Sequence, residues 1–212
     1  MMTNAGPATD TMLDLRDRAL LTMGMMGAFR RSELVRIRVG DIAPHPRGLS
    51  ITIPFSKGDQ TGVGQSVAIL EERRIEPVHH LRAWIEAAEI TAGAVFRRLT
   101  PHGRVTDAAL SEQSVALVVK KRAAAVGYDP ALFAGHSLRA CFLTEAGRTG
   151  ATLLKMQEDS RHKSIEMPST YVRDEELSAT MLQIGLHDGV WELDADKRQG
   201  LQMMVTSPEI GR

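Results

Sequence analysis

The stretch from residue 135 to residue 171 most constrains this chain, because it holds four chemically active side chains: two at the start of an expected helix and two beyond the next. His136 and Arg139 lie three residues apart, so on a helix they share a face near its N-terminus, where the dipole and the free N–H groups favour an anion. His162 lies in a basic segment, and Tyr171 follows it after eight intervening residues. Two histidines, an arginine and a tyrosine predict donors aimed at a phosphate, with a phenol as nucleophile, and not a metal site.

Further positive charge is available earlier in the chain. Arg30 opens an Arg-x-Ser-Glu-Leu run, in which Glu33 lies three residues later and is expected to orient the arginine. Lys57 lies between two runs that alternate like β-strands and are separated by a glycine-rich turn, so we expect a hairpin with Lys57 near its tip.

These motifs, taken in order, resemble the catalytic domain of the tyrosine recombinases, the phage-type integrases. The matching pieces are Arg30-x-Ser-Glu-Leu, the hairpin Lys57, Gly-His136-x-x-Arg139 and His162-x8-Tyr171, spread over about residues 12–173. The resemblance implies an α+β fold, mainly α, in which a helical catalytic domain carries a small antiparallel β-sheet, as in the DNA breaking-rejoining enzymes. It also implies site-specific recombination or integration of a mobile element, with double-stranded DNA as partner and a homotetramer assembled on it.

Transfer of a DNA phosphodiester to a phenol has requirements that these residues meet. Arginine offers planar, permanently charged donors to the non-bridging oxygens, and the leaving 5′-oxygen needs a proton. Tyrosine has an ordinary pKa near 10, so it must lose its proton as it attacks. The resemblance implies the same roles, a 3′-phosphotyrosyl product, and no need for metal, ATP or another cofactor. The expected catalytic residues are Arg30, Lys57, His136, Arg139, His162 and Tyr171, with Glu33 behind Arg30.

Charge is distributed unevenly along the chain. The formal net charge is zero, but residues from Asp174 onward hold eight acids and three bases, a net of −5, so residues 1–173 carry +5. A basic body is compatible with a DNA-binding face. Lys120, Lys121 and Arg122, at the end of an expected helix over about 108–126, are predicted phosphate contacts, against the alternative of a solvated helix terminus.

Composition limits the other classes. A hydrophobic content of 43% and a charged content of 25% are typical of a globular protein, and one cysteine, Cys141, excludes an internal disulfide. The first residues lack the pattern of a signal peptide, so we expect a cytoplasmic protein. The expected organisation is a disordered lead at 1–11, a catalytic domain at 12–173, and a tail at 174–212. The apolar stripe of the tail predicts docking between protomers, against the alternative that it folds back on its own domain.

Two departures from the family pattern bear on activity. Arg161 stands where the family usually has glycine, directly before the second histidine, and is expected to crowd the site or to add a phosphate contact. The chain also begins almost directly at the expected catalytic domain, so the other half of a DNA clamp is expected to be missing. Two alternatives therefore stay open: a type IB topoisomerase with the same chemistry, and a truncated, non-catalytic DNA-binding remnant.

Overall fold

The structure is a computed structural model that describes residues 10–53, 64–71, 73 and 75–161. All of them belong to one compact unit, Thr9–Leu186. Three of the expected catalytic residues, Lys57, His162 and Tyr171, lie outside the described residues, as does the tail at 174–212. Within the described residues, no helix is long and apolar enough to cross a membrane.

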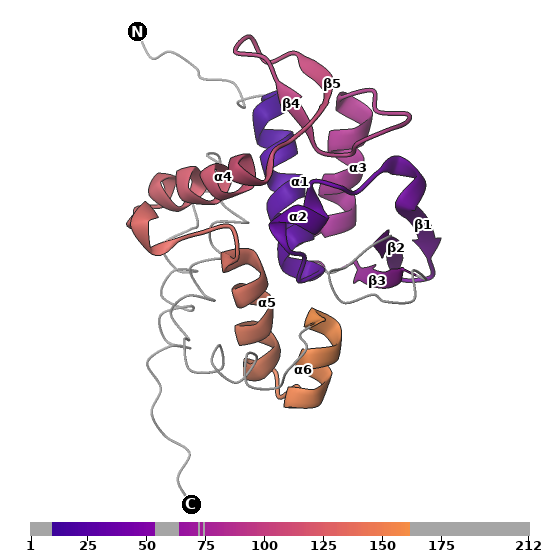
Figure 1. The fold of residues 1–212 in the computed structure, drawn as a ribbon, viewed down its shortest axis with the longest axis vertical. Coiled ribbons are helices and arrows are strands. Elements are labelled where there is room, and N and C mark those ends of the chain that lie inside the picture. Colours follow the sequence, from indigo (N-terminus) through magenta and orange to yellow (C-terminus); the bar gives the residue numbers. More distant parts are fainter. Residues whose placement is uncertain (1–9, 54–63, 72, 74, 162–212) are drawn as a thin grey trace, which may run out of the picture. The chain divides into compact units, whose positions relative to one another are not determined.

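Helix α1, Met12–Met26, forms the centre of the core (Figure 1). Thr11 caps it by a reciprocal pair of hydrogen bonds with Asp14, which fixes its first residue. Most of its later residues are buried because it packs against α3, Pro77–Ala87, and against α5, Ser137–Arg148. A helix that is apolar on nearly all sides requires such neighbours.

The chain leaves α1 through a tight turn and forms only a short second helix. Gly27 ends α1, Ala28 has a positive φ of 46°, and α2 spans Arg31–Leu34. The sequence predicts a longer helix over residues 30–39, and that prediction is wrong. Val35, Ile37 and Val39 alternate, and the backbone at 37–39 bonds to Gly93 and Val95 in place of a helical turn.

Two small antiparallel sheets follow, where one was expected. The first has the order β1-β2-β3, and Ile53 of β2 faces Gln65 of β3, which gives the hairpin whose connection contains Lys57. The second pairs β4 with β5. β1 and β5 were not predicted from the sequence. The strands are β1 Ile42–His45, β2 Gly48–Ile53, β3 Gln65–Leu70, β4 Arg97–Leu99 and β5 Val105–Ala109.

Two more helices complete the described fold. Helix α4, Glu112–Ala125, is capped by Ser111 and buries Val115, Val118 and Val119. It begins later than the expected 108–126, because residues up to Ala109 pair with β4 as strand β5. A short 3₁₀ turn, η2, Pro130–Leu132, leads into α5, and α6, Leu153–Ser160, packs against α5. A 3₁₀ turn at Val39–Asp41, η1, precedes β1. The fold is α+β with small antiparallel sheets, as predicted.

Candidate active site

Arg30 lies at the turn between α1 and α2, where it is partly open to solvent. It is the N-cap residue of α2, and its side chain is 40% exposed. Glu33 accepts hydrogen bonds from the backbone N–H of Arg30 at 2.9 Å and from its Nη1 at 2.5 Å. The expected contact of Glu33 with Arg30 is therefore present. It holds one nitrogen of the guanidinium in place, while the side chain stays partly exposed to solvent.

Arg139 reaches the same turn from α5. It is 6% exposed, and its Nη1 donates to the carbonyl oxygen of Ala28 at 3.0 Å, across 111 residues of sequence. Gly135, just before α5, packs close to α2, because a Cβ there would lie 2.9 Å from the side chain of Arg31. The turn at Ala28 thus places Arg30 and Arg139 near each other.

His136 differs from Arg139 in its exposure. It is the N-cap residue of α5 and is exposed, while Arg139 one turn later is buried. Ser137 Oγ accepts from the backbone N–H of Ala134 at 3.0 Å, which orders the approach to the helix. The sequence predicts that the two residues share one face of the helix, but His136 lies at the surface and Arg139 in the interior.

Arg161 is the residue that sequence reasoning interpreted least well. It ends α6 in the left-handed conformation, with φ 57°, and its side chain is 4% exposed. The side chain points into the protein, where acceptors of the chain itself take its donors in place of a phosphate. The available signal was a charged residue directly after a helix and directly before His162.

The guanidinium of Arg161 binds the turn that carries Arg30. Its Nη2 donates to Glu33 Oε2 at 2.8 Å and to the carbonyl oxygen of Ala28 at 2.9 Å, and its Nη1 donates to that of Gly27 at 3.1 Å. In return, Arg30 Nη2 donates to the carbonyl oxygen of Arg161 at 3.0 Å. This turn was not predicted as part of the site, although Gly27 marks it as a helix end.

Glu33 stays ionised in this setting. Burial acts to raise the pKa of Glu33, but the charge of Arg161 and hydrogen bonds from Arg30 and Arg161 outweigh it and hold that pKa below its ordinary value. Burial lowers the pKa of Arg161, and the charge of Glu33 acts in the opposite direction. The guanidinium remains protonated, because an arginine is not deprotonated in proteins. Two guanidinium groups therefore share one carboxylate, and the cluster has a net positive charge.

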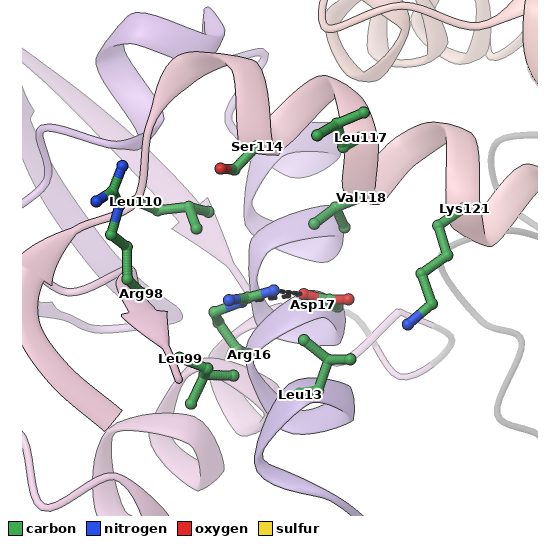
Figure 2. Close-up of a pocket in the computed structure, with 10 residues that line it drawn as sticks. All are labelled: Leu13, Arg16, Asp17, Arg98, Leu99, Leu110, Ser114, Leu117, Val118 and Lys121. Atoms are coloured by element: carbon green, nitrogen blue, oxygen red, sulfur yellow. Dashed lines mark hydrogen bonds and ion pairs between the residues drawn. The ribbon is translucent and has the colours of Figure 1, made fainter. Parts of the chain in front are cut away.

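The predicted DNA-contact residues of α4 lie in different surroundings from one another. Lys121 is exposed and lines a cavity of about 420 Å³ between α1, α4 and β4, on the other side of which lies Arg98 (Figure 2). Arg122 is turned inward, where its Nη2 lies 2.7 Å from Asp14 and 3.8 Å from Asp17. Lys120 is half-buried. None of the expected catalytic residues among those described lines this cavity.

Comparison with known proteins bears on the whole set. The family model described as "Phage integrase family" matches residues 2–177. The chain belongs to the phage integrase family. The matched range includes the six positions expected to be catalytic, three of which, Lys57, His162 and Tyr171, lie outside the described residues.

Relatives of the chain are recombinases by name. The chain is 42% identical over 160 residues to an integrase/recombinase XerD homolog of Selenomonas ruminantium, covering 74% of this chain and 47% of that protein. It is 30% identical over 167 residues to tyrosine recombinase XerD of Xanthomonas axonopodis pv. citri, covering 79% of this chain and 53% of that protein. The chain thus spans about half the length of the curated relatives it matches.

Solved structures support the fold. The XerH site-specific recombinase bound to palindromic difH substrate in a post-cleavage complex matches with TM-score 0.61 at 18% identity, over 78% of this chain and 44% of that one. The XerA recombinase matches with TM-score 0.54 at 15% identity, over 93% of this chain and 60% of that one. At such identities the likeness establishes the architecture shared with integrases.

Proposed function

We propose that this chain cleaves and rejoins DNA strands through a 3′-phosphotyrosyl intermediate at Tyr171. The observation that carries the proposal is the convergence at one turn of groups distant in sequence. Arg139 donates to Ala28, two residues before Arg30, and Arg30 donates to the residue that precedes His162. Membership of the phage integrase family supports the same chemistry.

The two arginines bind the phosphate that reacts. During transfer, negative charge grows on the non-bridging oxygens, and fixed guanidinium donors stabilise it without reorganising. Arg30 is exposed enough to reach a DNA phosphate. Arg139 is largely buried, and in the proposal it offers its guanidinium to the phosphate from beneath the surface. His162 adds a third donor in the proposal.

Proton transfer accompanies the exchange of bonds at phosphorus. The Tyr171 oxygen forms a bond to phosphorus while the bond from phosphorus to the 5′-oxygen breaks. The phenol proton passes to His136 or to water, and the departing 5′-oxygen takes a proton from the Lys57 ammonium. Rejoining reverses each step with a 5′-hydroxyl as the attacking group, so neither ATP nor metal enters the proposed cycle.

The partners in this proposal are double-stranded DNA and further copies of the chain. Exposed Lys121, with Lys120, is proposed to contact DNA phosphates, and Arg122 shares that role only if its ion pair with Asp14 opens. Recombination joins two duplexes, which favours a tetramer in which the tail at 174–212 docks on a neighbour. Residues 12–173 then form the catalytic domain, and the proposed compartment is the cytoplasm.

A covalent trap tests the nucleophile. A nicked suicide substrate should yield a DNA–protein adduct that survives a denaturing gel, and Tyr171→Phe should abolish it because it removes the attacking oxygen. The Tyr128→Phe variant is a matched control, since Tyr128 precedes α5 and packs near Phe133. An adduct that persists in Tyr171→Phe would refute the assignment.

A modified leaving group tests Lys57. Lys57→Ala should slow cleavage of ordinary DNA by about 10²-fold or more, because the 5′-oxygen departs unprotonated. A 5′-thio substrate needs little protonation and should restore most of the rate. Equal defects on both substrates would assign Lys57 to binding and not to proton transfer.

A further inference from the structure

We propose that Arg161 is a positioning residue that assembles the arginine pair of the active site from three separate elements. This inference rests on the proposed function, since it concerns the rate of the same cleavage step. Arg161 does not touch DNA in the proposal. It acts through Arg30 and Arg139.

The contacts of Arg161 span the parts that must meet. Its Nη2 donates to Ala28 and to Glu33. Its Nη1 donates to Gly27 and, at 3.2 Å, to the carbonyl oxygen of Asp159. The ring of Phe29 lies beneath it, with 5.4 Å between Cζ and the ring centroid. One side chain thus joins the end of α6 to the turn before α2.

The carbonyl oxygen of Ala28 is the group through which Arg161 is connected to Arg139. It accepts both from Arg161 Nη2 at 2.9 Å and from Arg139 Nη1 at 3.0 Å. Ala28 has a left-handed backbone, which a residue with a Cβ adopts only when its surroundings enforce it. The two arginine donors on the Ala28 carbonyl help to hold this backbone conformation. Loss of Arg161 should therefore make the turn, and with it the position of the Arg139 guanidinium, less well fixed.

The charge of Arg161 also changes what Glu33 does to Arg30. Alone, Glu33 would neutralise the single guanidinium of Arg30, which it contacts at 2.5 Å. Because Arg161 binds the other carboxylate oxygen at 2.8 Å, the three groups together keep one positive charge. Glu33 can therefore hold Arg30 in place without removing the charge that a phosphate requires.

The backbone at Arg161 makes a glycine variant informative. A φ of 57° is the left-handed region, in which glycine is at ease and arginine is not. Arg161→Gly is thus compatible with the local conformation, and its effects report on the lost side chain. Arg161→Lys keeps a charge but offers no planar fork for several acceptors at once.

The test combines cleavage at saturating DNA with hydrogen exchange of the free protein. For Arg161→Gly we expect the first-order rate of adduct formation on a suicide substrate to fall about 10- to 100-fold. The dissociation constant for DNA should stay within about threefold, because the side chain is 4% exposed. Arg161→Lys should recover part of the rate.

Hydrogen exchange tests the connection without using activity. In Arg161→Gly, peptides covering residues 24–34 and 153–161 should lose protection together, because the same side chain ties them. Lys155→Ala is the matched control: it removes a surface ion pair with Asp159 at 2.8 Å on the same helix and should change neither the rate nor exchange at 24–34.

The possible failures are separable. A wild-type chain that forms no Tyr171 adduct overturns the proposed function, while exchange still decides whether Arg161 ties the two segments. Normal adduct rates per folded molecule in Arg161→Gly, with or without a lower melting temperature, overturn the positioning role alone. Unchanged protection at 24–34 overturns the proposed connection.

Discussion

Glu33 shows how a single buried carboxylate is kept ionised by its neighbours. Its side chain is 5% exposed, and its pKa lies below the ordinary value of 4.5. A folded pKa below the unfolded one means that the ionised group stabilises the fold above about pH 4.5 and that this stabilisation is lost as the pH falls through the folded pKa.

We expect Glu33→Gln to lower the free energy of unfolding at pH 7 by about 3 kcal/mol, because it leaves two guanidinium groups beside a neutral amide. The difference from wild type should shrink as the pH falls from about 4.5 through the lower folded pKa of Glu33, because the wild-type carboxyl is then protonated as well. Urea unfolding at several pH values measures it. Glu158→Gln, at a side chain 73% exposed, is the control and should cost under about 0.5 kcal/mol. A pH-independent difference would contradict this account.

At the scale of whole helices, a buried cluster of charged side chains connects α1 with α4. Asp17 is buried, lies 2.6 Å from Arg16 on its own helix, and lies 3.8 Å from Arg122 on α4. Burial raises the pKa of Asp17, against the charges of Arg16 and Arg122. Figure 2 shows the Arg16–Asp17 pair at the base of the cavity between Arg98 and Lys121.

We expect Asp17→Ala to destabilise the protein by about 3–5 kcal/mol, because it leaves two largely buried guanidinium groups without this carboxylate. Asp10→Ala removes the more exposed Asp10–Arg18 pair at 3.0 Å and should cost less than about 1 kcal/mol. Chemical denaturation of both variants gives the comparison. Similar losses for the two would mean that burial of the cluster contributes little.

Charge is the relevant property at the scale of the whole molecule. Residues 1–173 carry a net +5 and residues 174–212 a net −5. Phosphate contacts release counterions, so we expect DNA affinity that is weak and falls steeply with added salt. A fluorescence titration from about 50 to 200 mM salt measures the slope. Nanomolar binding with little salt dependence would contradict the expectation.

Truncation after Arg173 addresses the proposed docking of the tail. If the tail acts on a neighbouring protomer, single-site cleavage should survive while paired-site recombination and assembly on DNA are lost. Affinity for a single site should rise at low salt, because five net negative charges are removed. A shortened chain that unfolds or loses single-site cleavage would place the tail in its own domain.

The sequence alone determined the features that depend on local signals. The alternating runs around Lys57 form β2 and β3, and the expected contact of Glu33 with Arg30 needs only three residues of separation. Alternation and helical spacing act over a few residues, so they can be read directly.

Tertiary structure alone decided the features that depend on desolvation by distant parts of the chain. Arg161 was expected beside the site, where it would crowd it or contact a phosphate, but it is buried against Glu33, 128 residues away. Arg122 was expected to contact DNA, but it pairs with Asp14, 108 residues away. The helix expected at 30–39 stops at Leu34, because the backbone beyond it bonds to Gly93 and Val95. No local pattern states which partner will exclude water from a charge or a backbone group, and that partner sets the cost of burying it.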